Sequence, residues 1–258
     1  MKKVWLTSLS SSNETVTKLI SHLKTYGLEA NGHFWEDNLE ELAWIKARDR
    51  LIDSSIIFWA ILASDENLNT PTIRYGLSLL TIAVQAQREL SFPIFIIQTE
   101  GEDLSPDTLT TVLKGVDVLS ASDTSLGAKL VAKTHAPPKE ISPEYRLNIH
   151  GNAHIGQWFE VGPYNLPWSG AIFGVNCGEI TFHAVGPKGS LPKDSVLNYP
   201  MKGMRLILDE KEYVAWSVQN EVDFQTSYFV KVKGFPKSVI FGSYSTEKEA
   251  ELSFIELQ

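Results

Sequence analysis

Short apolar runs alternate with amphipathic stretches along the first half of the chain. The runs typical of strands cover residues 3–9, 28–35, 56–62, 92–98 and 116–119. Between them apolar residues recur at helical spacing, as Val16, Leu19 and Leu23 do. The run at 56–62 is apolar at every position, which is typical of a strand buried on both faces of a parallel sheet. Five strand-then-helix units predict a doubly wound, five-stranded parallel sheet, and we expect the strand order 2-1-3-4-5.

Capping residues predict where the helices of this region begin. The expected starts are Asn13 as the first N-cap, residues 38–41 in capping-box style, Thr70 followed by Pro71, residues 105–107, and Leu126. Asn and Thr side chains accept hydrogen bonds from the free amides of a first turn, and proline suits the first helical position because it has no amide hydrogen to satisfy. Gly27 matches the C-terminal end of the first helix.

Past Pro143 the helical stripes give way to short runs rich in β-branched and aromatic residues. The expected strands cover residues 145–150, 154–161, 170–175, 179–185, 204–208, 212–218, 227–233 and 238–242. Residues 209–211 match a hairpin loop, residues 187–200 are too long for one, and residues 245–251 predict a short closing helix. The pattern predicts an all-β fold, either a β-sandwich or a barrel.

The two halves therefore predict two domains of different class. We expect a flavodoxin-like α/β domain at residues 1–136 and an all-β domain at residues 143–258, joined around Pro137 and Pro138.

Composition and charge exclude several classes of protein. The 258 residues are 43% hydrophobic and 21% charged, as in ordinary globular proteins, and the formal net charge of -8 opposes a dedicated role in binding nucleic acids or anionic membranes. Cys177 is the single cysteine, so no intrachain disulfide can form and a reducing compartment is favoured. The charged start lacks a signal-peptide pattern, and the longest apolar run, 56–63, is too short to span a bilayer. We expect a cytoplasmic protein without a membrane partner.

An open α/β sheet binds ligands outside the carboxyl ends of its strands, where the strand order reverses. Here that point lies between the first and third strands, where the loops at 7–13 and 64–70 meet. The first loop carries five hydroxyl side chains ahead of a helix N-terminus: Thr7, Ser8, Ser10, Ser11 and Ser12. These residues either bind an anion such as a phosphate or carboxylate, or they only cap and solubilise the loop. Because the loop has no glycine, it forms no Walker or dinucleotide-binding motif, and no cofactor is predicted.

Three segments of this half carry a resemblance to a known family. They are the strand and polar loop from Trp5 to Ser12, the apolar strand 55–62 followed by Ser64-Asp65-Glu66-Asn67, and the helix that begins Thr70-Pro71-Thr72-Ile73-Arg74-Tyr75-Gly76. Over residues 3–100 the chain resembles the superfamily of TIR-like domains and nucleoside 2-deoxyribosyltransferase-like proteins. The resemblance implies a flavodoxin-type fold and a catalytic glutamate at the start of that helix, often in a Glu-x-Gly motif that handles the ribose of a nucleoside or NAD. In this chain the corresponding slot reads Arg74-Tyr75-Gly76.

Arginine opposes the chemistry that the family's glutamate performs. Cleavage of an N-glycosidic bond passes through a positively charged, oxocarbenium-like state that a carboxylate stabilises. Either Glu36, Asp65 or Glu66 supplies the acid instead, or the domain binds its ligand without cleaving it, which is the interpretation we favour. Arg74 could grip a phosphate or carboxylate with its guanidinium, or form a surface salt bridge with an acid such as Glu66.

Two features of the all-β half bear on ligands. His150, His154 and His183 could contribute to a metal site, but a turn at 151–152 separates the first two and no carboxylate or thiolate pattern accompanies them, so no metal is predicted. Trp168 lies in a loop-like segment, where its ring could stack on a sugar, a base or a partner, or could tuck over the end of the sandwich.

Three functional hypotheses follow. The favoured one is a non-catalytic protein that senses a nucleotide or interacts with other proteins, with a nucleotide or nucleoside as its expected ligand. The second is an NAD or nucleoside N-glycosidase or deoxyribosyltransferase-like enzyme whose acid comes from an unusual position. The third is a carbohydrate-binding or carbohydrate-processing protein, which requires Trp158 or Trp168 to lie exposed on a concave face. A homodimer is expected by analogy with TIR-like domains.

Overall fold

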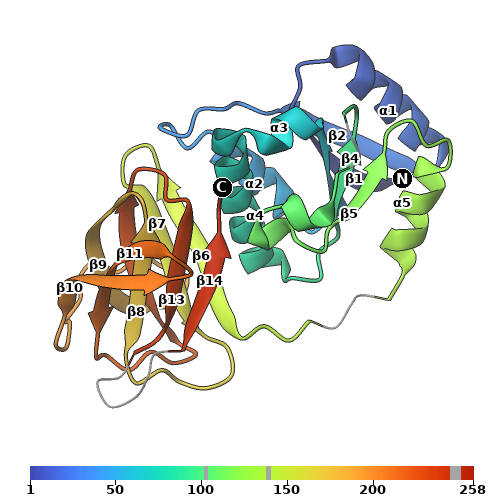
Figure 1. The fold of residues 1–258 in the computed structure, drawn as a ribbon. Helices are drawn as coiled ribbons and strands as arrows, with labels where there is room; N and C mark the ends of the chain where they lie inside the picture. Colours follow the sequence, from blue (N-terminus) through green and yellow to red (C-terminus); the bar gives the residue numbers. More distant parts are fainter. Residues whose placement is uncertain (102–103, 138–140, 245–250) are drawn as a thin grey trace. The chain divides into compact units, whose positions relative to one another are not determined.

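The chain forms two compact units, Met1–Ile141 and Ser142–Gln258, in the computed structural model shown in Figure 1. The structure describes residues 1–101, 104–137, 141–244 and 251–258. Among these residues no helix is long and apolar enough to cross a membrane.

The first unit is built on a five-stranded parallel sheet in the order β2-β1-β3-β4-β5. Its strands are β1 (Lys2–Ser8), β2 (Leu28–Phe34), β3 (Ile56–Ala63), β4 (Ile94–Gln98) and β5 (Asp117–Ser120). Every neighbouring pair is parallel, so the predicted flavodoxin-like topology is confirmed. The central strand β3 is buried almost throughout because helices cover both faces of the sheet.

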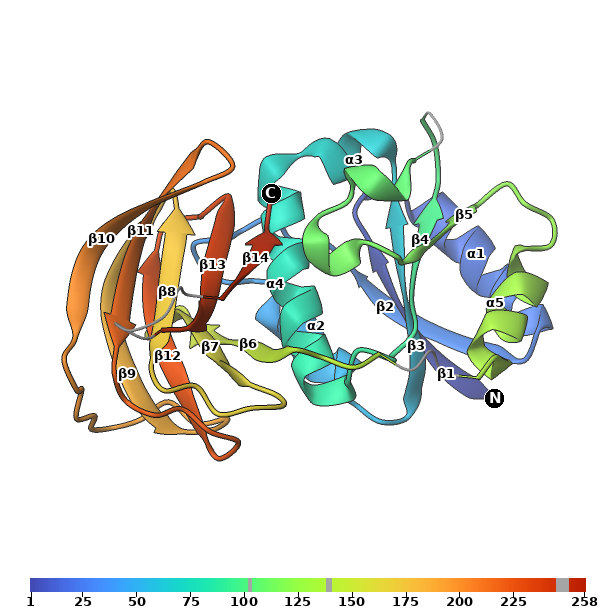
Figure 2. The same cartoon turned by 60° about the horizontal axis from the view of Figure 1, so that its bottom comes forward.

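Helices cover the two faces of this sheet in separate layers, as Figure 2 shows. One layer holds α1 (Asn13–Thr25) and α5 (Leu126–His135), and the other holds α2 (Ile45–Leu51) and α4 (Pro71–Arg88). Leu23 of α1 and Leu130 of α5 pack with Phe58 of β3 in one apolar core. The short helix α3 (Asp65–Asn69) follows β3 directly and leads into α4.

Two of the predicted helix starts are wrong by a few residues. Ser12 caps α1 in place of Asn13, because its hydroxyl accepts the amide of Thr15 at 3.4 Å. The second helix begins at Ile45 and not near Asn38, since residues 39–44 form turns in which Leu42 has a positive φ of 50°. That left-handed conformation is incompatible with a continuous α-helix.

The helix start predicted at residues 105–107 has Ser105 as its N-cap and Pro106 at its first position, but it opens a 3-10 turn and not an α-helix. Two single turns of 3-10 helix lie here, η1 (Pro106–Thr108) and η2 (Thr111–Leu113). Two residues separate them, and each turn is only three residues long, which is too short a run for a stable α-helix.

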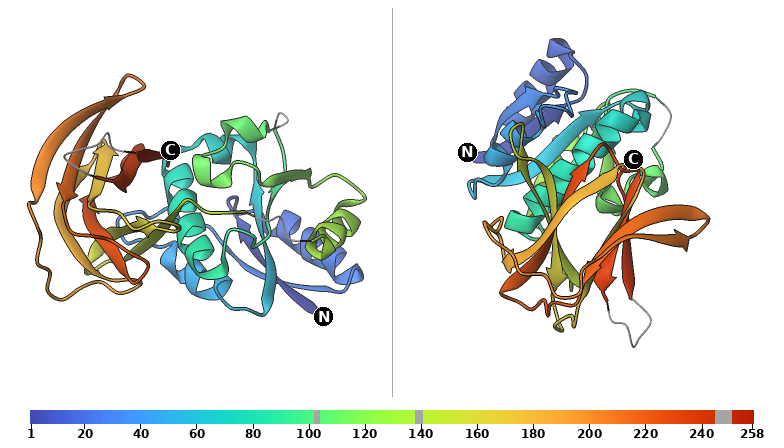
Figure 3. Two further views of the ribbon diagram at one scale, coloured as in Figure 1. Left: turned by 90° about the horizontal axis from the view of Figure 1, so that it is seen from below. Right: turned by 90° about the vertical axis from the view of Figure 1, so that its left-hand side faces the viewer.

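The second unit consists of two antiparallel sheets, and its strands are seen from two further directions in Figure 3. One sheet has the order β6-β7-β12-β9 and the other the order β10-β11-β8-β13-β14. The strands are β6 (Tyr145–Asn152), β7 (Gly156–Pro163), β8 (Ala171–Asn176), β9 (Glu179–Pro187), β10 (Met201–Leu208), β11 (Lys211–Val218), β12 (Thr226–Lys233), β13 (Ser238–Ser243) and β14 (Leu252–Glu256). Phe159 of one sheet packs on Phe173 of the other with ring centroids 5.2 Å apart, so the sheets face each other as a β-sandwich.

All eight predicted strands are present, and the sequence analysis missed β14. The hairpin loop predicted at 209–211 is the turn Asp209–Glu210, in which both residues have positive φ, as a tight turn between twisted strands requires. The segment 187–200 connects strands of different sheets, as its length indicated. The predicted closing helix at 245–251 falls almost wholly on residues 245–250, which lie outside the described residues.

Candidate functional site

The first two predicted ligand residues are used inside the α/β unit. Thr7 is fully buried, and its hydroxyl accepts a hydrogen bond from the Trp59 indole nitrogen at 2.8 Å. Ser8 is also buried, and its hydroxyl donates to the main-chain carbonyl of Ser10 at 2.7 Å. Both hydroxyls therefore stabilise the end of β1 from within.

The other three hydroxyl residues lie at the solvent side of the same loop. Ser12 caps α1, and its hydroxyl lies 3.0 Å from that of Thr15. Ser11 is exposed and Ser10 is half-buried. The first turn of α1 is thus open to solvent next to two hydroxyl groups, which is the geometry that an anion at a helix N-terminus would use.

Arg74 projects from the first turn of α4 toward main-chain carbonyls. Its Nη1 donates to the carbonyl oxygen of Leu68 at 3.2 Å and to that of Thr108 at 2.9 Å. Among the described residues no carboxylate, Glu66 included, forms an ion pair with it. The guanidinium therefore ties the start of α4 to the η1 turn.

The three candidate acids contact different residues. Glu36 is exposed and pairs with Lys46 at 3.4 Å, whereas Asp65 accepts a hydrogen bond from Asn69 at 2.9 Å within α3. Glu66 is exposed, and its main-chain carbonyl accepts the Thr70 hydroxyl. Within the described part of the chain, these contacts join no two of the three acids.

Trp35, which the sequence analysis treated only as a strand end, packs at this edge of the sheet. Its amide donates to the carbonyl of Ser8 at 2.8 Å, and its indole ring lies against Gly76. A Cβ at Gly76 would sit 2.6 Å from Cζ2 of that ring. The glycine of the Arg74-Tyr75-Gly76 segment therefore has a packing role, because it lets α4 approach the indole.

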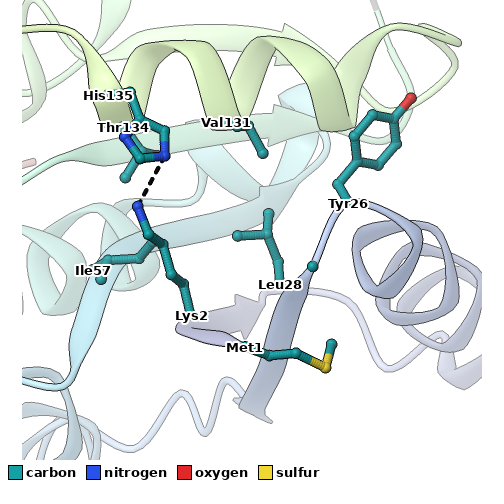
Figure 4. Close-up of a pocket in the computed structure, with 9 residues that line it drawn as sticks. Met1, Lys2, Tyr26, Leu28, Ile57, Val131, Thr134 and His135 are labelled. Atoms are coloured by element: carbon teal, nitrogen blue, oxygen red, sulfur yellow. Dashed lines mark hydrogen bonds between the residues drawn. The ribbon is translucent and has the colours of Figure 1, made fainter.

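Two depressions of the α/β unit lie away from the ends of β1 and β3. The first, of about 430 Å³, lies at the opposite edge of the sheet, where β1 and β3 begin. Figure 4 shows Lys2, Tyr26 and His135 at its rim. Lys2 Nζ lies 2.8 Å from His135 Nε2, and Leu28 forms part of the apolar floor. The second, of about 500 Å³, lies beside β5. None of the candidate ligand-binding or catalytic residues lines either depression.

In the all-β unit the three histidines lie apart. His183 faces the interior of the sandwich, where Nδ1 lies 2.8 Å from the Tyr228 hydroxyl. His150 belongs to the opposite, outward face of its sheet, and His154 lies in the turn between β6 and β7. Among the described residues no group of three His, Cys, Asp or Glu side chains is placed to hold a metal ion.

His183 is the most strongly perturbed histidine of this unit. Burial, reinforced by the positive charge of Lys202, lowers its pKa to about 4. The Tyr228 hydroxyl also reaches the carbonyl of Trp216 at 3.3 Å, so His183 and Tyr228 link the two sheets. Burial also raises the pKa of Tyr228, so this pair is uncharged at neutral pH.

The outward face of the four-stranded sheet carries a row of four side chains in register across all its strands. We call it the outer row, and it consists of His150, Trp158, Lys231 and Phe182. Phe182 is 54% exposed, Trp158 is half-buried, and their ring centroids lie 5.8 Å apart at 65°. Lys231 Nζ lies 5.8 Å from the centre of the Trp158 ring.

A buried carboxylate is hydrogen-bonded to the histidine of the outer row. Glu160, the neighbour of Trp158 on this face, is 4% exposed, and its carboxylate lies 2.5 Å from His150 Nε2. The Gly189 amide donates to the other carboxylate oxygen at 2.7 Å. Burial raises the pKa of Glu160, but the hydrogen bonds from His150 and Gly189 outweigh it and hold that pKa below its usual value.

Trp168 lies in the loop between β7 and β8 and is half-buried. Its amide and carbonyl both bond to Val222, at 2.8 and 2.9 Å, so that the loop is held against the segment before β12. Trp158 and Trp168 are thus both half-buried, and Phe182, which lies beside Trp158, is exposed. Trp158 was a candidate from the sequence, but its contact with Phe182 could not be predicted, because it depends on strand register.

Comparison with known proteins leaves the family open. No protein-family model and no curated protein matches the chain. Among solved structures, a CheY-like protein (tadZ) from Pseudomonas aeruginosa PAO1 is 10% identical with a TM-score of 0.34, and covers 54% of this chain and 98% of its own. An NAD kinase from Archaeoglobus fulgidus in complex with ATP is 12% identical with a TM-score of 0.31, covering 95% of this chain and 94% of its own. Similarities this low carry no argument about function, and the resemblance to TIR-like proteins stays a prediction.

Proposed function

We propose that the protein is a non-catalytic binding protein, in which a flavodoxin-like α/β domain is joined to an all-β recognition domain. The observation that carries the proposal is the position of Arg74. It occupies the slot in which the family that the sequence resembles has a catalytic glutamate, and its guanidinium is bound to the carbonyls of Leu68 and Thr108. A side chain held in this way stabilises the local backbone and leaves the slot without a negative charge.

The surrounding acids support the same conclusion. An oxocarbenium-like state needs a carboxylate close to the sugar ring. Asp65 is engaged with Asn69 and Glu36 with Lys46, and these contacts lie in different elements. Both carboxylates therefore have partners within the protein.

A nucleotide or nucleoside remains the expected ligand of the α/β domain. Its support is the open first turn of α1, where free amides lie beside Ser10 and Ser11 and would favour a phosphate group. Binding there requires no chemistry from Arg74.

The test is incubation of the purified protein with NAD and with deoxynucleosides, followed by chromatography for free base. We expect no base above the level of a protein-free blank, both for the wild type and for Arg74→Glu. Release of base by the wild-type protein that is abolished by Glu36→Gln or Glu66→Gln would overturn the proposal and establish the glycosidase alternative.

A further inference from the structure

We infer that the outer row is a binding site for an acidic carbohydrate, that is, a sugar chain that carries carboxylate groups. The inference rests on the binding role proposed above and assigns it to the outward face of the sheet β6-β7-β12-β9. It is carried by the adjacent rings of Trp158 and Phe182, the ammonium of Lys231 and a raised border.

The aromatic part is an apolar corner on an otherwise polar sheet face. Trp158 and Phe182 come from strands separated by β12, yet their rings meet at 5.8 Å and 65° above that strand. The main-chain carbonyl of Ile155 fixes the indole by accepting the Trp158 Nε1 hydrogen at 3.1 Å. Exposed rings that are fixed by packing and hydrogen bonding are typical of recognition surfaces.

A loop forms a raised border along one side of this corner. The segment 188–200 folds over the same sheet face, where Gly189 bonds to Glu160 and Pro192 lies against Gly186. Ser195 fastens the loop, because its hydroxyl accepts the Val185 amide at 2.8 Å and donates to the Val185 carbonyl at 3.0 Å. The outer row is thus the open part of a face whose other part is covered.

The charges around the corner favour a negative group on the ligand. Within the described part of the chain Lys231 forms no ion pair, and its ammonium lies beside the Trp158 ring. His150 uses Nε2 on Glu160, and its side chain is 19% exposed, which leaves Nδ1 for a ligand. Glu160 itself is buried, and its two carboxylate oxygens face His150 Nε2 and the Gly189 amide and not the open surface.

These features match an acidic sugar better than a neutral sugar or a nucleotide. A sugar ring has apolar C–H groups on its faces and hydroxyls at its edge, so it can pack into a corner of two tilted rings while His150 contacts a hydroxyl. A flat base prefers a ring to which it can lie parallel. Lys231, which forms no ion pair with any of the described residues, favours a carboxylate on the ligand.

The experiment is isothermal titration of the full chain with three acidic probes: oligogalacturonate, a hyaluronan tetrasaccharide and sialyllactose. Cellotetraose, maltotetraose and AMP serve as comparison ligands. We expect saturable binding of at least one acidic probe, weakened about tenfold by Trp158→Ala and by Phe182→Ala. Lys231→Met should weaken binding of that probe about fivefold and reduce its dependence on salt.

The matched control comes from the other sheet. Phe254 is 36% exposed and has Lys211 Nζ 5.3 Å from its ring centre, so Phe254→Ala and Lys211→Met remove a similar ring and cation elsewhere. Both should leave binding unchanged. Three outcomes would overturn the inference: absence of saturable binding for all acidic probes, tighter binding of a neutral sugar or AMP that Trp158→Ala weakens, or an equal loss in the Phe254 and Phe182 variants. The assay for free base does not depend on any of these outcomes, so the two proposals can fail separately.

Discussion

At the scale of single residues, side chains of the types expected at a ligand site here stabilise the fold. Thr7 accepts the indole hydrogen of Trp59, Ser12 caps a helix, and Arg74 binds two carbonyls. Residue type alone predicts what a side chain can bind. Its partner is decided by which groups the fold brings within hydrogen-bond distance.

The role of Arg74 gives a prediction about stability. Arg74→Met removes hydrogen bonds from a charged donor to two carbonyls, so the free energy of unfolding of the α/β unit should fall by about 2 kcal/mol. Urea denaturation followed by circular dichroism at the helix band measures it, since every helix in the described residues belongs to this unit. Lys46→Met, which removes only an exposed pair with Glu36 in the same unit, is the control and should change little. Equal losses of unfolding free energy in both variants would contradict this role of Arg74.

His183 gives a prediction about pH. Its pKa of about 4 in the folded protein lies below the ordinary 6.5, so the unfolded chain binds more protons between these values. The stability contributed by neutral His183 is therefore complete above pH 6.5 and is lost as the pH falls toward 4, by up to about 3 kcal/mol.

Urea denaturation of wild-type and His183→Gln proteins at pH 7 and pH 4 measures this effect. The variant should be less stable at pH 7 but should lose less stability on acidification than the wild type. His154→Gln, which alters a histidine in an exposed turn, is the control, and its stability should fall with pH as that of the wild type does. Identical pH dependence in all three proteins would show that His183 titrates normally.

At the scale of elements, close packing explains a motif that sequence analysis could interpret only through family resemblance. Gly76 lies in the middle of a buried helical face, and its missing side chain leaves room for the indole of Trp35. Glycine costs about 1 kcal/mol relative to alanine inside a helix. The contact between α4 and Trp35 offsets that cost.

Gly76→Ala should therefore destabilise the α/β unit by about 1–2 kcal/mol, because the new methyl group would lie 2.6 Å from Trp35 Cζ2. In a Trp35→Leu background the clash is relieved, and the same substitution should become neutral or stabilising through helix propensity. A double-mutant cycle by urea denaturation measures the coupling. If Gly76→Ala had the same effect in both backgrounds, the packing explanation would be wrong.

The wrong start of the second helix and the missed strand β14 have a common cause. Residues 38–41 have the composition of a helix start, and Asn38 does accept the Glu41 amide, but the positive φ of Leu42 delays α2 until Ile45. The strand β14 is only five residues long and pairs with β13 alone. Short elements of this kind depend on a neighbour that the local sequence does not name.

At the scale of the whole molecule, the alternation of strands and helices predicted the fold class because parallel strands must be joined by crossovers that cover the sheet. The same reasoning separated the all-β half, where period-two patterns replace helical ones. A division of function between the two parts remains a proposal, and so does a homodimer.

The division into domains predicts that each part folds alone. Residues 1–141 and 142–258, expressed separately, should each show cooperative urea unfolding and dispersed NMR spectra, because each has its own core and complete sheets. A fragment of residues 1–93 is the control, since it lacks β4 and β5 and should not fold. Failure of both larger fragments to fold would contradict two independent domains.

The sequence by itself determined the order of the elements, the parallel and antiparallel classes and the absence of acid in the Arg74 slot, because these depend on local periodicity and residue identity. Only the tertiary structure decided which hydroxyls are buried, where Arg74 donates, and that His150, Trp158, Lys231 and Phe182 form one row. That row joins residues up to 81 positions apart, from His150 to Lys231 (231 − 150). A register shift of one residue in any strand would turn its member of the row to the other face, and register is set by the pairing of whole strands.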